Sequence, residues 1–418
     1  MGSNMEQHYE IPEILFLGSA ISDETADEIL AKSRVKPSVA PVNFQRNLLR
    51  GMPSQNLTVF SLPPVATYPH GAFWGWGARK DHVLPDVVAT YIPAVNLPGL
   101  KQLSTLLCTF FKCSGWLWKK RTNHKKIILV YGGYVFTQLA AQWAGKLFHT
   151  KTCCIVTDPI RDEVYLTRSR GLKHLLTRTM WRLSEAIRSG FHGYICLTEA
   201  LVDLYAAKNK PHLLVEGVAD PRTFDDIPAQ QKEDPPVIMY AGALSKGFGI
   251  PVLLEAVHNL DAPCQLWLFG GKGECQDLID EYERKDDRIK YWGKVPRYDL
   301  LCAMKKASVL VSVKTIEADR SQYQFPSKIM EYASSGTLIA ATRVAGIPEE
   351  YFSHLIPMES DTPEGVKSTL QKILALSNEE RIAQGEETKN WIENTKNSHI
   401  QAQRILKLLQ QICEEEQK

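Results

Sequence analysis

Apolar runs alternate with amphipathic helical segments along the first half of the chain. Each run ends at glycine or at a small or polar residue, which is typical of a strand that is buried on both faces and followed by a turn. The runs lie at 13–18, 126–133, 152–158 and 193–199. Strands that alternate with helices in this way predict a parallel sheet with helices on both of its faces.

The second half repeats this plan more regularly. Its apolar runs lie at 212–220, 236–244, 264–273, 289–295, 307–313 and 337–343, and an amphipathic helical tail covers 378–413. We therefore predict an α/β protein made of two doubly wound, Rossmann-like domains. The predicted domains are 5–212 and 213–389, and we expect the C-terminal helix, from about 390 to 418, to cross back and complete the first domain.

One region interrupts the alternation. Residues 51–100 are rich in proline, glycine and aromatic side chains, as in YPHGAFWGWG at 68–77. We predict a long irregular loop here, and a loop of this length in a compact domain is more often functional than idle.

Length and charge refine the picture. The 418 residues suit two domains of roughly 200 residues each. Residues 1–212 hold 25 Lys and Arg against 15 Asp and Glu, and residues 213–418 hold 24 against 32, so the overall charge of +2 divides into +10 and −8. This asymmetry predicts that the first domain faces an anionic partner, with chance variation between domains as the alternative.

The cysteines and the apolar runs exclude several classes of protein. The nine cysteines include no Cys-x-x-Cys spacing, so we expect neither a zinc site nor a disulfide framework. No run of 18 apolar residues predicts a membrane-spanning helix. The opening stretch lacks the basic and apolar segments of a secretory signal, so we expect a cytoplasmic protein.

Two glycine-containing segments of the second half carry candidate anion-binding residues. In YAGALSKGFGI (240–250), Gly242 ends a strand and Lys246 lies where strand becomes helix, although a surface lysine in a turn is an equal alternative. In FPSKIMEYASSG (325–336), a helix begins after Pro326, and its first amides, at Ser327 and Lys328, are expected to bind an anion.

Three further residues complete a candidate nucleotide site. Glu331 follows Ser327 by about one helical turn, where its carboxylate can accept hydrogen bonds from a ribose diol; a solvated helix residue is the alternative. Gly271, in FGGKGE (269–274), would let a flat base approach the backbone. Val295, in WGKVPRYDL (292–300), lies in a segment that can offer main-chain hydrogen bonds to a base edge. Each of the last two is equally consistent with an ordinary loop.

The order of these four segments resembles the donor-binding half of family-4 glycosyltransferases, over about 212–375. The first half resembles the family more loosely, through YIPAVNLPGLK (91–101) and Asp158 at a strand end, which are similar to bacterial exopolysaccharide and capsule enzymes. The resemblance implies the GT-B fold, with two Rossmann-like domains facing each other across a cleft. It also implies a retaining transfer from a nucleoside-diphosphate sugar to a glycan or lipid-linked acceptor.

The resemblance also implies roles for particular residues. Lys246 matches the lysine that neutralises the donor pyrophosphate, Ser327 and Lys328 match the amides that hold its phosphate, and Glu331 matches the second glutamate of the family's E-x7-E motif. The first glutamate is replaced by Tyr323, and Ala243 stands where the family has an arginine. In the first half, Gly18 and Ser19 match a loop that approaches the donor phosphate, and Asp158 matches a position near the acceptor. Asp158, Lys246 and Glu331 are thus the expected catalytic residues, although Asp158 could equally cap its loop.

The expected chemistry needs neither a metal nor a pair of carboxylates. Lysines and a helix N-terminus can neutralise the leaving diphosphate, and no Asp-x-Asp sequence is present. In the retaining, front-side route of this family the leaving phosphate accepts the acceptor proton, unlike the carboxylate chemistry of a glycosidase. Two alternatives remain: a non-catalytic sugar-nucleotide-binding subunit, which Tyr323 favours, and a sugar-nucleotide epimerase, for which no acidic residues are found.

Two basic segments predict where the protein acts. Residues 112–126 hold six Lys or Arg and two tryptophans, and residues 168–188 hold six Lys or Arg with interleaved apolar residues. This pattern favours an anionic membrane surface and hence a peripheral location on the inner face of the membrane. A solvated helix is the alternative, and no nucleic-acid-reading motif accompanies the segments.

Overall fold

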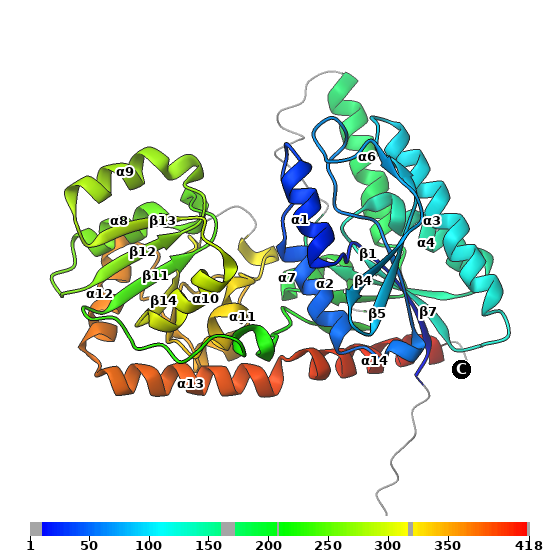
Figure 1. The fold of residues 1–418 in the computed structure, drawn as a ribbon. Helices are drawn as coiled ribbons and strands as arrows, with labels where there is room; N and C mark the ends of the chain where they lie inside the picture. The colour runs from blue at the N-terminus through cyan, green and yellow to red at the C-terminus, as the bar shows by residue number, and fades with distance from the viewer. Residues whose placement is uncertain (1–10, 160–171, 207–208, 317–320, 416–418) are drawn as a thin grey trace, which may run out of the picture. The chain divides into compact units, whose positions relative to one another are not determined.

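The computed structural model describes residues 11–159, 172–206, 209–316 and 321–415 (Figure 1). The chain forms two compact units. Unit 1 contains the residues up to Val215 together with those from Ser398 onward, and unit 2 contains Glu216–Asn397.

Unit 1 is built on an eight-stranded sheet with the strand order β10-β9-β8-β7-β1-β2-β5-β4. Its strands are parallel except for β4, which pairs antiparallel with β5. In chain order they are β1 (Glu13–Gly18), β2 (Leu57–Ser61), β4 (Lys80–Leu84), β5 (Val87–Tyr91), β7 (Lys126–Tyr131), β8 (Lys151–Val156), β9 (Gly193–Cys196) and β10 (His212–Leu214). The short strands β3 (Gly75–Trp76) and β6 (Ala94–Val95) form a separate antiparallel pair.

The helices of unit 1 connect these strands and cover the sheet. They are α1 (Asp23–Lys32), α2 (Ala40–Arg50), α3 (Leu100–Lys119), α4 (Val135–Leu147), α6 (Leu172–Arg188), the short α7 (Glu199–Leu201) and α14 (Ser398–Glu414). α3 packs against α4, whereas α14 packs against α2 and against β7, β8 and β10 (Figure 1). The last helix of the chain therefore belongs to the core of its first unit.

Unit 2 contains a six-stranded, fully parallel sheet with the order β13-β12-β11-β14-β15-β16. The strands are β11 (Val237–Ala241), β12 (Gln265–Phe269), β13 (Ile289–Gly293), β14 (Val309–Ser312), β15 (Ile339–Ala341) and β16 (Ile356–Pro357). Successive residues of β11 enter opposite cores: Met239 joins one cluster, and Ile238 and Tyr240 join the other. Burial on both faces explains why these strands are continuously apolar in sequence.

The helices of unit 2 cover both faces of its sheet. They are α8 (Ile250–His258), α9 (Gln276–Lys285), α10 (Arg297–Lys306), α11 (Lys328–Ser334), α12 (Pro363–Ala375) and α13 (Asn378–Thr395). The cluster around Met239 includes apolar residues of α10, α11 and α13, and the cluster around Ile238 includes those of α8, α9 and α12. Side-chain caps fix two helix starts, at Thr362 for α12 and at Ser377 for α13.

The predicted α/β architecture is confirmed, and two local predictions are wrong. The region 51–100 is not one irregular loop, because β2, β4 and β5 within it join the main sheet. The tail is not one continuous helix, because α13 ends at Thr395 and α14 begins at Ser398. The strands are also shorter than the apolar runs, since several predicted runs extend into the loops that follow them.

Each sheet has one point where the chain reverses the direction in which it adds strands. In unit 1 this point lies between β1 and β7, and in unit 2 it lies between β11 and β14. The connections at such a point leave on opposite sides and open a crevice at the carboxyl ends of the two strands, where α/β proteins bind their ligands. These two edges are therefore the places where the candidate site residues should meet.

A buried ion pair holds together the two ends of unit 2. The amine of Lys396 lies 2.6 Å from Oε1 of Glu216 and 2.6 Å from the carboxylate of the more exposed Glu350. The Tyr351 hydroxyl donates to the same Glu216 oxygen at 2.7 Å. The amide of Ala219 donates to the Lys396 carbonyl at 2.9 Å, so side chains and backbone both join the two terminal segments.

Lys396→Met should lower the free energy of unfolding of unit 2 by about 3–5 kcal/mol, because it leaves the Glu216 carboxylate buried without a counter-charge. Urea denaturation followed by tryptophan fluorescence measures this change. Lys372→Met is the control: its amine pairs with Glu359 at the surface, and exposed ion pairs contribute little. Equal stability of the two variants would contradict the role given to Lys396.

Candidate functional site

In unit 2 the end of β11 receives a lysine side chain from α11. Gly242 follows β11 with a φ of +145°, and a Cβ atom placed on it would lie 2.8 Å from Nζ of Lys328. The same amine lies 3.7 Å from the centre of the Tyr240 ring and 5.4 Å from that of Phe248. The positive φ favours glycine at 242, and any side chain there would displace the Lys328 amine.

The Lys328 amine lies in an environment that disfavours its charge. Burial lowers its pKa to about 7, and the charge of Lys314 adds to this effect. Lys314 follows β14, so it comes from the second strand of the switch point, and its amine donates to Gln324 at 3.2 Å. A bound anion would reverse this balance, because a negative charge beside the amine favours the charged form. The sequence reasoning identified Lys328 but missed Lys314.

Lys246 occupies the loop between β11 and α8. It begins a short 3₁₀ turn, its side chain is exposed, and its backbone amide donates to Oε1 of Glu274 at 2.7 Å. Gly249 closes this turn with a φ of +71°, where a Cβ atom would overlap the Val313 carbonyl oxygen. The lysine is thus carried on a loop that is tied to the end of β12 and lies tightly against the end of β14. Glu274, which holds this loop, was not assigned a role from sequence.

Glu331 has an ionic partner that the sequence did not indicate. Its Oε1 lies 2.8 Å from a guanidinium nitrogen of Arg297, the first residue of α10. Both side chains are partly open to solvent, and Arg297 is the more exposed of the two. The second carboxylate oxygen can still accept hydrogen bonds, so Arg297 can orient the glutamate without blocking it.

The beginning of α11 leaves amides available for an anion. The amides of Ile329 and Met330 donate to the carbonyls of Pro326 and Ser327 at 2.9 and 3.2 Å. Within the described ranges, no acceptor contacts the amides of Ser327 and Lys328, and the Ser327 side chain makes no capping bond. The two amides predicted from sequence therefore remain candidates for phosphate binding.

Two loops at the ends of β12 and β13 lie side by side. Gly270 donates to the Gly293 carbonyl at 2.8 Å, and a Cβ atom on Gly271 would lie 3.3 Å from Cε of Lys294. Val295 is partly buried against the Met239 core. The structure thus brings the two predicted base-binding loops together at the edge that also carries Gly242.

Tyr323 lies in a separate short turn of unit 2. It ends the 3₁₀ turn Ser321–Tyr323 and is partly buried. Its neighbour Gln324 accepts the bond from Lys314. The acidic side chain that the family resemblance called for at 323 is replaced here by a phenol, and the adjacent amide engages a lysine instead.

Unit 1 carries a cavity at its own switch point. The volume is about 380 Å³, and its described lining comes from the ends of β1, β7 and β8, from loops beside them and from the first turns of α2, α3 and α4. The lining residues are Gly18, Ser19, Pro41, Leu62, Pro63, Pro64, Val65, Ala66, Lys101, Tyr131, Gly133, Tyr134, Thr137, Thr157 and Asp158. Three residues predicted from the first half, Gly18, Ser19 and Asp158, therefore lie around one cavity.

The loop after β1 is firmly held. The Ser19 amide donates to Oε1 of Gln45 at 2.7 Å, and Nε2 of Gln45 donates to the Ser19 hydroxyl at 2.9 Å. A Cβ atom on Gly18 would overlap the same Gln45 oxygen. Because its amide already has an acceptor, Ser19 is not arranged here to receive a phosphate. The predicted role of Gly18 and Ser19 at the donor phosphate stays a prediction.

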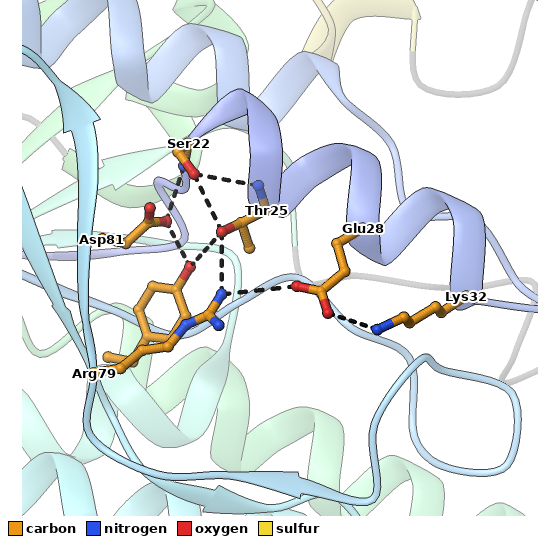
Figure 2. Close-up of polar contacts among 7 residues, drawn as sticks. Ser22, Thr25, Glu28, Lys32, Arg79 and Asp81 are labelled. Atoms are coloured by element: carbon orange, nitrogen blue, oxygen red, sulfur yellow. Dashed lines mark hydrogen bonds and ion pairs between the residues drawn. The ribbon is translucent and has the colours of Figure 1, made fainter.

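A polar network fixes the far end of this loop (Figure 2). The Ser22 amide donates to Oδ2 of Asp81 at 2.9 Å, and the Tyr91 hydroxyl donates to the same oxygen at 2.5 Å. Arg79 donates to the Thr25 hydroxyl at 3.1 Å. Burial and the bond to Asp81 raise the pKa of Tyr91 to about 12, so the phenol remains a donor at neutral pH. β4 and β5, absent from the sequence prediction, thus position the rim of the cavity.

Asp158 follows β8 with an exposed side chain. Its carbonyl oxygen accepts a hydrogen bond from the buried Arg188, which also donates to the Gly132 carbonyl at 2.6 Å. Arg188 therefore joins the ends of β7 and β8 beneath the cavity. Burial raises the pKa of the neighbouring Tyr131 to about 12, which keeps this lining group neutral.

The structure corrects the composition of both basic segments. Arg188 is buried, as described above, and Trp116 is buried with its indole donating to Thr58 at 3.1 Å, so neither reaches a membrane surface. Trp118, in contrast, is 62% exposed. Arg178 and Arg182 of α6 are exposed, and residues 168–171 of the second segment lie outside the described residues.

Neither a metal cluster nor a spanning helix occurs in the described ranges. No three His, Cys, Asp or Glu side chains gather there as metal ligands. None of the helices described has both the length and the apolarity to cross a membrane.

Comparison with solved structures decides the fold. Sucrose-phosphate synthase from Thermosynechococcus elongatus aligns with a TM-score of 0.60 at 17% identity, covering 96% of this chain and 99% of that one. Anabaena HepE in complex with UDP aligns with a TM-score of 0.60 at 12% identity, covering 96% and 100%. The fold is GT-B. At these identities the solved structures establish the architecture alone.

Sequence comparison adds a domain assignment for unit 2. Residues 235–375 match the family model described as glycosyl transferases group 1. A curated relative from Arabidopsis thaliana, one of the subunits of phosphatidylinositol N-acetylglucosaminyltransferase, is 22% identical over 206 residues, which is 46% of this chain. The match spans 44% of that relative's length. Together with the fold, these findings support a glycosyltransferase, and the family match covers Gly242, Lys246, Lys328 and Glu331.

Binding of a nucleoside diphosphate should be coupled to proton uptake by Lys328. The free amine has a pKa of about 7, and a diphosphate beside it raises that pKa. Affinity for UDP should therefore be constant below about pH 7 and fall as the pH rises above it, by at most tenfold per unit. Calorimetry at pH 8, in two buffers of different ionisation enthalpy, measures the proton uptake directly.

Two variants test whether Lys328 is the group that takes up the proton. Lys328→Met should abolish the proton uptake, whereas Lys246→Met should weaken UDP binding and leave the uptake unchanged. UDP binding without proton uptake in the unmodified protein at pH 8 would show that Lys328 does not meet the diphosphate.

Proposed function

We propose that this chain is a retaining, metal-independent glycosyltransferase that moves a hexose from a nucleoside-diphosphate sugar to a glycan or lipid-linked acceptor in polysaccharide biosynthesis. The observation that carries the proposal is the arrangement at the β11 and β14 ends. A buried amine, two open amides and an oriented carboxylate gather there, within the segment that matches glycosyl transferases group 1.

The donor would be held by its diphosphate, its ribose and its base. Lys328, Lys246 and the amides of Ser327 and Lys328 would neutralise the diphosphate, and charge that grows on it as the sugar leaves would strengthen these contacts. Glu331, oriented by Arg297, would accept hydrogen bonds from the ribose diol. The loops of Gly271 and Val295 would frame the base. The solved HepE structures in complex with UDP and with UDP-glucose support a UDP-sugar as the donor.

The acceptor would occupy the unit 1 cavity. Asp158 lines this cavity with an exposed side chain, and it would position an acceptor hydroxyl. In a front-side transfer the sugar's bond to the diphosphate breaks as its bond to that hydroxyl forms, and the hydroxyl proton passes to the leaving phosphate oxygen. The anomeric configuration is retained without a carboxylate nucleophile.

One observation favours a second function, a sugar-nucleotide-binding subunit without turnover. Tyr323 stands in place of an acidic residue, and its neighbour Gln324 engages Lys314. Release of free UDP from UDP-sugars by the purified protein separates the two functions, because a binding subunit would hold the donor unchanged. Product analysis by proton NMR reports the anomeric configuration, and activity should persist in EDTA.

Glu331→Ala should weaken UDP-sugar binding by about 1.5–3 kcal/mol, because a charged hydrogen bond to the ribose is lost. Isothermal titration with UDP-glucose and the other common UDP-sugars measures this loss. Glu349→Ala is the control, since that carboxylate is exposed and pairs with Arg343 at the surface. Unchanged donor affinity in Glu331→Ala would remove the ribose assignment.

We also propose that unit 1 rests on an anionic membrane surface through α3. Apolar side chains are exposed along this helix at intervals of three, four or seven residues: Leu100, Leu103, Leu107, Phe111 and Trp118. We call this set the α3 stripe. At its end Trp118 packs with the Arg121 guanidinium, and Lys119 is exposed beside it. An apolar stripe next to basic residues is the pattern of an interfacial helix, and it supports the cationic first half facing lipid headgroups.

Charge reversal at Lys119, Lys120 and Arg121 should release the protein from anionic vesicles. Each basic residue near such a surface contributes about 1 kcal/mol, and salt screens this contribution. Co-sedimentation with phosphatidylglycerol vesicles, but not with neutral phosphatidylcholine vesicles, is the expected result, with release at high salt. Reversal of Lys285, Lys305 and Lys306 in unit 2 is the control and should have no effect. Failure to bind either kind of vesicle would argue for a soluble acceptor.

A further inference from the structure

Lys101 is a buried lysine that the proposed function does not yet use. It lies in the first turn of α3, it is 8% exposed, and it lines the unit 1 cavity. Its amine donates to the Val65 carbonyl at 2.5 Å, and no carboxylate within the described ranges pairs with it. Of the described lining residues, Lys101 is the one basic side chain and Asp158 the one carboxylic acid.

The position of Lys101 is unfavourable for a cation in the unliganded protein. Burial lowers the pKa of its amine, since no counter-charge compensates for the loss of water. The first turn of a helix also carries the positive end of the helix dipole, which repels a cation and attracts an anion. An ammonium group has three donors, and a single acceptor leaves two of them for a ligand. The site is therefore complementary to an anion.

A second polar group, the hydroxyl of Tyr134, also lines the cavity. The Tyr134 hydroxyl is buried next to the Thr105 hydroxyl, and Tyr134 lines the same cavity. A phenol can accept one hydrogen bond and donate another, so the Tyr134 hydroxyl would donate to a phosphate oxygen while the Thr105 hydroxyl donates to it. Lys101 and Tyr134 thus offer donors, while Asp158 offers an acceptor for a sugar hydroxyl.

We propose that the unit 1 cavity binds a phosphate group of the acceptor through the amine of Lys101. This inference rests on the proposed function, because it names the chemical class of the acceptor. It also assigns separate tasks to the basic and the acidic lining residue: Lys101 holds the acceptor's phosphate, and Asp158 meets the hydroxyl that receives the sugar.

The phosphate could belong to a lipid-linked sugar or to a soluble sugar phosphate. The α3 stripe favours the lipid, because Leu100, its first member, is exposed and immediately precedes Lys101 in the chain. One end of the same helix thus offers an amine to a phosphate, while its outer face offers apolar side chains to an acyl or isoprenoid chain.

Matched pairs of probes test this assignment. Glucose 6-phosphate is compared with glucose, and citronellyl phosphate with citronellol, by isothermal titration of the full chain. The unmodified protein should bind the phosphorylated member of at least one pair tenfold or more tightly than its neutral counterpart. Lys101→Met should remove this preference, Lys101→Arg should retain most of it, and Lys146→Met, which changes an exposed lysine of α4, should leave it intact.

The donor site provides an internal control. Lys328→Met should retain the phosphate preference for these probes and weaken UDP binding, and Lys101→Met should do the reverse. Failure of the proposed function would therefore appear as loss of UDP binding or turnover, separately from failure at Lys101. Thermal unfolding verifies that each variant is folded.

The relative affinities for the two phosphorylated probes identify the kind of acceptor. A preference for citronellyl phosphate over glucose 6-phosphate assigns the site to a lipid-linked acceptor, and the opposite order assigns it to a sugar phosphate; either supports an acceptor phosphate on Lys101. No preference for phosphate in either pair, or a preference that survives in folded Lys101→Met and disappears in Lys328→Met, would overturn the proposal.

Discussion

The buried ion pair between Lys396 and Glu216 joins the two ends of unit 2. Glu216 is the first residue of that unit and Lys396 is the last but one, so a single ion pair closes a segment of about 180 residues. Tyr351 donates to the same Glu216 oxygen and Glu350 pairs with the Lys396 amine, and these contacts offset part of the cost of removing two charges from water. The amide of Ala219 also donates to the Lys396 carbonyl. The segment that enters unit 2 and the segment that leaves it therefore lie side by side. The strands that carry the proposed donor-binding residues lie between Glu216 and Lys396 in the chain.

Both units place a lysine amine at the point where the strand order of the sheet reverses. Each sheet opens a crevice where its strand order reverses, and each places a lysine amine there with too little compensating charge: Lys328 in unit 2 and Lys101 in unit 1. A bound anion stabilises the charged form of such an amine. The electrostatic stabilisation that the amine lacks in the free protein therefore contributes to the free energy of anion binding. Glutamate and aspartate are placed differently, on partly open surfaces, where Glu331 and Asp158 can meet hydroxyl groups. This division suits a reaction between a diphosphate donor and a hydroxyl acceptor.

The sequence predicted a strand correctly where both faces of the strand are buried, so that its residues form a continuous apolar run. The apolar runs of β1, β7 and β11 are covered on both faces, so composition alone revealed them, whereas β4 and β5 bury alternate side chains and are hidden among proline, glycine and aromatic residues. For the candidate site, the helix start at Pro326 and the glycine at 242 indicated the positions of the groups that we propose bind phosphate. Their partners could not be predicted, because Arg297, Gln45, Arg188 and Lys314 come from elements that only the fold brings near. Helical phase likewise decides that Trp116 is buried and Trp118 exposed, two residues apart in one basic segment.

The position of α14 has a consequence for the order in which the protein is made. Unit 2 is one continuous stretch, so all of its strands have left the ribosome by the time residue 397 has emerged, and it can fold as soon as it is complete. Unit 1 is synthesised first but lacks α14 until the end, and the surfaces of α2, β7, β8 and β10 that this helix covers stay uncovered throughout the synthesis of unit 2. The amino-terminal half of the chain is therefore the last to mature. During that interval the apolar surface that α14 covers in the folded protein is open to contact with other chains.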